Sequence, residues 1–255
     1  MKIINKIDVK IKNRKYTIDF GLPENDKEKQ EMFRLRRRIY VEKEKYIPAA
    51  LCKDELEIDS YDNNGFCTYF IAMVDGNFIG TVRLIRMTPL PIAKNYFEFD
   101  EPEEVKMIPS SKKAEVGRFI SVGLIGNNFL PRHLVLLGLF DSLERFAYQN
   151  GIEVGYGAIK KLFLEKLETI KFPFKRITEY RVIYTEENED PLKNFFKDEN
   201  NPVIPIYFLR NNVRNYLDSL LKETVAFKQI NDSHFVFRGE IGMGMAIIAK
   251  KLGLN

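Results

Sequence analysis

The chain has 255 residues, enough for one large domain or two small ones with a sizeable core. A content of 45% hydrophobic and 30% charged residues excludes a disordered or fibrous protein, and no stretch approaches the roughly 18 apolar residues of a membrane span. The N-terminal segment mixes lysine, aspartate and arginine with its apolar residues, so it does not read as a secretory signal. We therefore expect a cytoplasmic protein without a membrane span.

Cysteine and histidine are scarce, and their positions exclude two classes of protein. Cys52, Cys67, His133 and His234 lie too far apart for a disulfide framework or a zinc finger, and we expect no metal. The 40 basic and 36 acidic residues leave a net charge of +4. This excess suits an acidic partner protein but falls short of a nucleic-acid footprint, so no nucleic-acid partner is expected.

The first half of the chain predicts two hairpins and a helix. Residues 2–20 alternate apolar and polar around a turn, which indicates a hairpin at the edge of a sheet. Helical spacing of apolar residues follows over 24–45, and residues 47–64 form an acidic loop with a helical turn. Asp-Gly at 75–76 lies between two β-rich runs, which favours a hairpin of two central strands.

The second half of the chain alternates predicted strands and helices, an order typical of a mixed α/β fold. The predicted elements are a strand over 114–124, a helix over 130–149, a strand over 152–159, a helix over 160–170, a strand over 175–185, a short helix near Pro191, a strand over 203–209, and helices near 211–223 and 240–252. Segment 185–201 is the expected flexible loop. We divide the chain into an N-terminal hairpin extension (1–22), a main domain (23–210) and a C-terminal helical extension (211–255) packed on that domain.

One arginine of the basic run at 34–38 falls on the apolar side of its helix. At 100° per residue, Arg36 shares an arc with Met32, Leu35 and Ile39, whereas Arg34, Arg37 and Arg38 lie outside it. A buried guanidinium needs a carboxylate or an anionic ligand. The other three arginines form a solvated face, or the footprint of a binding module for nucleic acid or an acidic protein, which is the alternative from another class of function.

Arg83 repeats this pattern on a strand, where every second residue is apolar or threonine. A structural ion pair and a ligand-binding role remain equally open for it. The possible acidic partners are Glu57, Asp59 and Asp62 from the acidic loop. Together these groups predict a cleft in which pKa values are shifted for acid/base chemistry.

Glu115 and Arg118 would complete this cleft if the strand that carries them is irregular. On a regular strand they face opposite sides, but a bulge at Gly117 would turn both toward the cleft. The convergence of the charged residues therefore depends on that bulge.

The motifs from Arg36 to Phe119 resemble those of the acyl-homoserine-lactone synthases (autoinducer synthases), a branch of the GNAT N-acyltransferase superfamily. The shared pattern is Arg36 with spaced aromatics, the acidic ELEIDSYD loop, Arg83 in GTVRLI, Phe97 in AKNYFEF, and Glu115 with Arg118 in EVGRF. The related N-acyl amino acid synthases and exosortase-associated acyltransferases share the superfamily and remain the alternative. Tyr40, Tyr46 and Ala114 replace aromatics usual in the lactone synthases, so the acceptor amine stays open.

The resemblance implies a GNAT-like fold, with a mixed central sheet that is splayed between central strands along 114–123 and flanked by helices. It also implies an enzyme of autoinducer synthesis for quorum sensing. Such an enzyme moves a fatty acyl group from acyl carrier protein, or from acyl-CoA, to an amine such as S-adenosylmethionine. No tightly bound cofactor is implied. Neither cysteine has a histidine nearby in sequence and no Gly-x-Ser-x-Gly elbow is present, which is compatible with direct attack by the amine.

The resemblance also gives expected roles to individual residues. Glu115 is the expected base, assisted by Arg118. The residues expected to bind the substrate are Arg36, Tyr40, Tyr46, Asp59, Asp62, Arg83 and Phe97. Arg132 and His133 stand where the superfamily binds the phosphate of phosphopantetheine, although a surface or capping role for His133 is the simpler interpretation. Apolar residues of 129–170 are expected to line the acyl-chain pocket.

Overall fold

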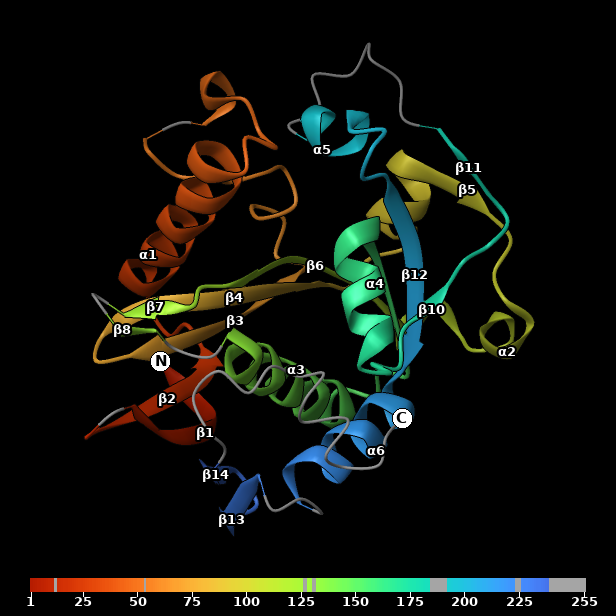
Figure 1. Cartoon of the computed structure of the whole chain (residues 1–255). Coiled ribbons are helices and arrows are strands. Elements are labelled where there is room, and N and C mark those ends of the chain that lie inside the picture. The colour runs from red at the N-terminus through yellow and green to blue at the C-terminus, as the bar shows by residue number, and fades with distance from the viewer. Residues whose placement is uncertain are drawn as a thin grey trace.

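A ten-stranded mixed sheet forms the centre of the computed structural model, which describes residues 1–11, 13–52, 54–125, 128–129, 132–183, 192–222 and 226–238 (Figure 1). The strands run in the order β10-β12-β9-β6-β4-β3-β2-β1-β14-β13. Neighbours are antiparallel except for β6 with β9 and β1 with β14, which are parallel. The strands of this sheet are β1 (Lys2–Ile11), β2 (Arg14–Leu22), β3 (Cys67–Val74), β4 (Asn77–Ile85), β6 (Lys113–Ser121), β9 (Val154–Lys160), β10 (Lys175–Arg176), β12 (Val203–Leu209), β13 (Phe227–Asn231) and β14 (His234–Phe237).

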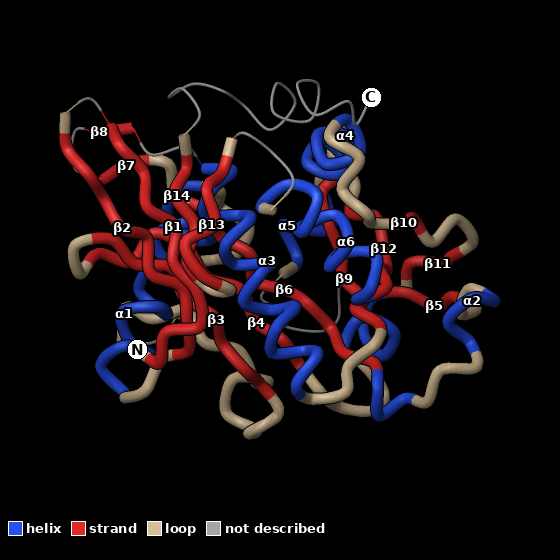
Figure 2. Tube along the Cα trace, turned by 90° about the horizontal axis from the view of Figure 1, so that it is seen from below, coloured by secondary structure: helices blue, strands red, loops and turns tan. Residues whose placement is uncertain are grey.

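Two short two-stranded sheets and a set of helices complete the described fold (Figure 2). The small sheets pair β5 (Phe97–Phe99) with β11 (Tyr180–Val182) and β7 (Leu124–Ile125) with β8 (Asn128–Phe129). The α-helices are α1 (Asp26–Arg37), α2 (Glu103–Lys106), α3 (Arg132–Gln149), α4 (Lys161–Thr169), α5 (Lys193–Lys197) and α6 (Arg210–Leu221). Shorter turns are the π-helical η1 (Arg38–Lys43) and η3 (Ile92–Tyr96) and the 3₁₀-helical η2 (Ala49–Leu51) and η4 (Ser110–Lys112).

Alternation along β3 explains why helices cover both faces of the sheet. Tyr69 and Ile71 join the apolar cluster beneath α1, whereas Phe70 and Ala72 join the larger core against α3. Figure 1 shows α1 and α3 on opposite sides of β3 and β4. Each fully buried side chain of these clusters contributes about 2 kcal/mol of apolar burial, so the sheet is held from both sides.

The predicted boundaries of the first helix and of the central hairpin are close to those observed. Asn25 caps α1, because its side-chain oxygen accepts a hydrogen bond from the backbone N–H of Glu28 at 2.9 Å. The β3–β4 turn places Asp75 and Gly76 at φ 49° and 77°, the positive values that a primed turn requires. The helix continues past Arg37 as the π-helical turn η1, which leads into the acidic loop.

The N-terminal hairpin was predicted at a sheet edge, and that prediction is wrong. β1 and β2 form as expected, but β1 also pairs in parallel with β14, with Lys6 opposite His234 and Val9 opposite Phe237. The hairpin therefore lies inside the sheet, and β13 lies outside it. The sequence pattern of residues 227–237 was not recognised as a hairpin, so the region after α6 is not purely helical.

The strand predicted over 175–185 is also wrong in part. The structure divides it into β10, which pairs with β12 at the end of the large sheet, and β11, which pairs with β5. The predicted helix near 240–252 lies outside the described residues, as does 185–191 of the predicted flexible loop. The later part of that loop contains α5.

Candidate active site

A cavity opens where two central strands separate. β6 and β9 pair in parallel at Lys113–Val154, Ala114–Gly155 and Glu115–Tyr156, and this ladder ends there although both strands continue. Beyond that point residues 116–123 and 157–160 line a cavity of about 1020 Å³. A Cβ at Gly157 would lie 3.0 Å from the carbonyl oxygen of Val116, so glycine allows the close approach where the strands diverge. The predicted splay is therefore confirmed, and it begins at residue 116 rather than at 114.

Three arginines and three carboxylates meet on one side of this cavity. Arg36 of α1 donates to Glu57 through Nε and to both oxygens of Asp62, at 3.0 and 2.9 Å. Arg83 of β4 donates to Asp59 at 2.7 Å and to Asp62 at 2.8 Å. The exposed fraction of Arg36 is 0% and that of Glu57 is 2%. The predicted convergence of helix, loop and strands is therefore confirmed.

A bulge in β6 brings Arg118 into the same cluster. The register against β4 passes from Thr81–Ile120 to Arg83–Gly117, so β6 has an additional residue at this point. Arg118 has φ 53°, a left-handed conformation that is uncommon for a residue with a side chain. Its guanidinium contacts Glu57 at 3.0 Å and Asp59 at 2.9 Å, and these ion pairs hold the strained residue in place. The bulge was predicted, but its left-handed residue is Arg118, not Gly117.

The arginines keep the carboxylates of the cluster ionised. Burial alone would raise the pKa of Asp59, but the charges of Arg118 and Arg83 outweigh burial and hold that pKa well below its usual range. Burial opposes the ionisation of Glu57 and Asp62 in the same way, and neighbouring arginines again lower the pKa of both acids. The three positive and three negative charges therefore balance within the cluster.

Glu115 is a carboxylate of a different kind. Burial raises its pKa to about 7, against the smaller effects of the hydrogen bond and the charges nearby. Its Oε2 accepts a hydrogen bond from the backbone N–H of Ile92 at 2.7 Å, and among the described residues no ion pair to it is present. It lines the cavity at the last residue pair before the splay. A carboxylate with a pKa near neutrality, facing a cavity, has the properties of a general base.

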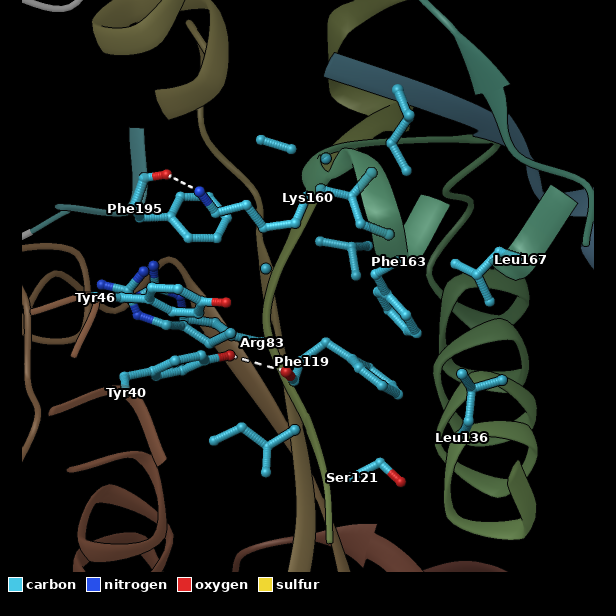
Figure 3. A pocket seen from close by; sticks show the side chains of 18 of the residues that line it. Tyr40, Tyr46, Arg83, Phe119, Ser121, Leu136, Lys160, Phe163, Leu167 and Phe195 are labelled. Atoms are coloured by element: carbon cyan, nitrogen blue, oxygen red, sulfur yellow. Dashed lines mark hydrogen bonds between the residues drawn. The ribbon is translucent and has the colours of Figure 1, made fainter. Parts of the chain in front are cut away.

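Aromatic side chains form one wall of the cavity (Figure 3). The hydroxyl of Tyr40 donates to the carbonyl oxygen of Phe119 at 2.9 Å, which joins η1 to β6 across the cavity. Tyr46 lies beside it, with ring centroids 6.3 Å apart, and packs edge-on against Phe195 at 5.1 Å. Lys160, at the end of β9, points its amine toward this group. Sequence reasoning had selected Tyr40 and Tyr46 but missed Phe195 and Lys160.

The opposite wall of the cavity is apolar. Figure 3 shows Phe119, Phe163, Leu136 and Leu167 on that side, away from the two tyrosines. Further members are Phe140, Ile170, Phe174 and Phe208. This wall comes from β6, α3, α4 and the segments after them, and most of it falls within the predicted range 129–170. A long apolar space joined to a polar one suits a substrate with a hydrocarbon chain.

Three predicted substrate-binding residues do not line this cavity. Phe97 of β5 is fully buried in the second core, where it packs edge-on against Tyr180 with centroids 5.3 Å apart. The side chains of Arg36 and Asp62 are 1% and 0% exposed within the ion cluster. The predicted site residues that do line the cavity are Tyr40, Tyr46, Asp59, Arg83, Glu115, Arg118, Arg132 and His133.

Arg132 and His133 lie at the start of α3. Arg132 is exposed, and its carbonyl oxygen accepts a hydrogen bond from Ser121 at 2.8 Å. Burial lowers the pKa of His133 to about 4, and its ring packs edge-on against Phe237. His133 is therefore neutral near pH 7 and not the surface histidine that the simpler interpretation expected, whereas Arg132 carries a charge.

The splayed mixed sheet with helices on both faces is the GNAT-like fold that the motifs led us to expect. The sequence matches the family model described as autoinducer synthase over residues 19–186. The chain therefore belongs to the autoinducer synthase family, and it is an acyltransferase whose products are N-acyl compounds. No curated protein matches the sequence. None of the helices in the described ranges has the length and apolar content needed to cross a bilayer.

Solved structures share the fold at low sequence identity. The acyl-homoserine-lactone synthase LasI superposes with a TM-score of 0.55 and 19% identity, covering 84% of this chain and 98% of its own. BjaI is a CoA-dependent acyl-homoserine lactone synthase whose structure contains S-adenosylmethionine and isopentyl-CoA. It superposes with a TM-score of 0.52 and 16% identity, covering 89% of this chain and 91% of its own. TofI, in a ternary complex with an inhibitor and methylthioadenosine, superposes with a TM-score of 0.51 and 14% identity, covering 80% of this chain and 96% of its own. At these sequence identities, the similarity shows a shared fold.

Proposed function

We propose that the protein transfers a fatty acyl group from a thioester donor to the primary amine of a small acceptor. The observation that supports this most strongly is Glu115, a half-buried carboxylate with a pKa near 7 at the point where β6 and β9 diverge. It lines the same cavity as the aromatic wall and the apolar wall. An amine at the first wall and an acyl chain at the second would place the thioester carbon beside it.

In this reaction the amine nitrogen attacks the thioester carbon directly. The new C–N bond forms as the C–S bond breaks, so the products are an amide and a free thiol. Glu115, directly or through a water molecule, accepts the proton that the amine loses, and the leaving thiolate then takes up a proton. Backbone N–H groups along the part of β6 that no longer pairs with β9 supply hydrogen bonds for the oxyanion and for the amides of the pantetheine arm.

The ion cluster supports the site by holding its parts in position. Arg83, Arg118 and Asp59 line the cavity, while Arg36 and Asp62 act behind them. Because both oxygens of Asp59 already accept hydrogen bonds from arginines, a direct contact with an acceptor ammonium would have to compete with those pairs. We therefore assign Arg36, Glu57 and Asp62 a positioning role and leave acceptor contacts to the cavity-lining residues.

The donor is a carrier-bound fatty acyl thioester. We propose acyl carrier protein as the carrier, with coenzyme A as the second possibility, since both present a phosphopantetheine arm. Arg132 at the cavity mouth would contact the phosphate, whereas neutral His133 would contribute packing and no charge at pH 7. The basic run of α1 does not favour the alternative of a nucleic-acid binding module. Arg34 and Arg37 pair with Glu31 and Glu42, and Arg36 is buried.

Two acceptors are candidates. S-adenosylmethionine would give an acyl-homoserine lactone and methylthioadenosine, the reaction for which the family is named. A free amino acid would give an N-acyl amino acid, and the charge of Lys160 in the aromatic wall favours this second candidate. Mass spectrometry of extracts from cells overproducing the protein would identify the acyl chain and the head group together. Absence of any N-acyl product, in cells and with purified protein, would contradict the proposed function.

A further inference from the structure

Lys160 crosses the cavity from the end of β9 to α5 (Figure 3). Its residue is 6% exposed, and its amine donates to the backbone carbonyl of Phe195. The second partner is Asp198, whose carboxylate lies 3.5 Å away and whose side chain is 42% exposed. An ion pair that is long and open to solvent on one side neutralises a buried amine only weakly.

The amine of Lys160 also lies over two aromatic rings. It is 5.0 Å from the ring centroid of Phe195 and 5.6 Å from that of Tyr46, within the range of cation–π attraction. The Lys160 ammonium therefore already occupies the electron-rich ring faces that would otherwise attract the sulfonium of S-adenosylmethionine. A second positive charge placed there would be repelled by Lys160.

The other charges of the cavity leave Lys160 as the buried cation with the least compensation among the described lining residues. Arg83 and Arg118 are neutralised within the ion cluster. Lys43, Lys166 and Arg132 are exposed, so water solvates them. Burial lowers the pKa of Lys160, so its ammonium form would gain from an anionic partner.

From this arrangement we infer that Lys160 is a specificity-determining residue that binds an anionic group on the acceptor, and that the acceptor is an α-amino acid without a second positive charge. The inference deepens the proposed function and depends on it. The amine of such an acceptor would face Glu115 while its carboxylate accepts a hydrogen bond from the third N–H of Lys160. The side chain of the acceptor would lie against Tyr40, Tyr46 and Phe195.

The test compares two compounds that differ only in the carboxylate. N-decanoyl-L-phenylalanine and N-decanoyl-phenethylamine are titrated by calorimetry into the full-length protein and into the Lys160→Met, Lys160→Arg and Lys161→Met variants. We expect the native protein to bind the carboxylate compound at least about 10-fold more tightly, as a charge-assisted hydrogen bond provides. Lys160→Met should remove this preference and leave binding of the neutral compound unchanged.

The variants separate recognition from packing. Lys160→Arg should keep most of the preference, and Lys161→Met, an exposed neighbour that does not line the cavity, should keep all of it. Equal weakening of both compounds in Lys160→Met would show a structural role and overturn the assignment. No preference in the native protein, or no binding of either compound, would overturn it as well.

A turnover assay keeps this result distinct from failure of the proposed function. Thiol release from decanoyl-CoA is followed with phenylalanine, phenethylamine and S-adenosylmethionine as acceptors. Release with S-adenosylmethionine, accompanied by methylthioadenosine and unaffected by Lys160→Met, would overturn the inference while the proposed acyl transfer stands. No release with any acceptor from the CoA donor or from decanoyl-acyl carrier protein would contradict the proposed function, whatever the calorimetry shows.

Discussion

Arg36 and Asp62 form a two-pronged ion pair in which Nη1 and Nη2 contact Oδ1 and Oδ2 at 3.0 and 2.9 Å, with side chains that are 1% and 0% exposed. Planar groups matched in this way fix each other's orientation. Asp62 also accepts a hydrogen bond from Arg83 of β4. The ion pair therefore fixes α1 relative to a strand of the central sheet. The stability of the fold and the shape of the cavity therefore depend on the same contacts.

The first prediction concerns this pair. Arg36→Met leaves Glu57 and Asp62 short of a buried positive charge, so the free energy of unfolding should fall by about 3 to 5 kcal/mol. Arg34→Met on the same helix is the matched control, because its pair with Glu31 is exposed and should contribute less than about 1 kcal/mol. Urea denaturation of both variants measures the difference. Equal losses for the two variants would contradict the structural role of Arg36.

The second prediction concerns acid. The pKa values of Glu57, Asp59 and Asp62 are lower in the folded protein than in the unfolded chain. Groups with a depressed folded pKa stabilise the protein above their unfolded pKa, and this stabilisation is lost as the pH falls through the folded pKa. The free energy of unfolding should therefore decline from about pH 4 downward. A urea midpoint that stays constant between pH 5 and pH 3 would contradict the prediction.

The third prediction concerns catalysis by Glu115. Replacement by glutamine keeps the shape of the side chain but removes the base, so kcat/KM should fall by about 10²- to 10⁴-fold. In the native enzyme kcat/KM should rise with pH through about 7 as Glu115 loses its proton, and this step should be absent in Glu115→Gln. Glu165→Gln, at an exposed position of α4, is the control. An unchanged pH profile in Glu115→Gln would assign the base to another group.

Glu115 also affects stability, with the opposite sign. Its pKa is raised on folding, so the folded state binds more protons than the unfolded chain between about pH 4 and the folded value of about 7. This group therefore lowers the free energy of unfolding as the pH rises through that window. The stability of Glu115→Gln relative to the native protein should be greater at pH 8 than at pH 4, by roughly 3 kcal/mol. Urea denaturation of both proteins at both pH values tests this, and a variant that gains no stability relative to the native protein between pH 4 and pH 8 would contradict it.

The fifth prediction concerns the apolar wall. Leu136→Phe adds volume to the side of α3 that lines the cavity, so the enzyme should prefer shorter acyl chains. Each methylene that no longer fits loses about 0.8 kcal/mol, or about fourfold in relative kcat/KM. Competition among donors of different chain length, read by mass spectrometry, gives the preference. Leu137→Phe changes the adjacent core position that does not line the cavity, and a similar shift there would indicate general repacking.

The parts of the site that the sequence predicted are those with a local signal. Arg36 stands out because helical spacing puts a charge among Met32, Leu35 and Ile39, and the bulge in β6 is signalled by a glycine between two charged residues. The left-handed residue is nevertheless Arg118, because its ion pairs with Glu57 and Asp59 form only once distant segments meet. Local sequence does not contain that information.

Lys160 and the pairing of β14 with β1 were missed for the same physical reason. Lys160 and Lys161 are neighbours of one type, and only the fold makes one buried and the other exposed. The segment 227–237 has the turn residues Asn231, Asp232 and Ser233 between two runs that contain apolar β-formers, a signal that could have predicted its hairpin. Its parallel partner β1 is more than 200 residues away in the chain, and no local pattern specifies that pairing.

The contact between β1 and β14 has a consequence for biosynthesis. A ribosome releases the chain in the direction from N- to C-terminus, so β1 emerges before β14 and receives its second neighbour only after His234–Phe237 has emerged. Until then one side of β1 offers unpaired backbone groups to any other nascent strand. A protein arranged in this way depends on a late segment of the chain to protect an early one.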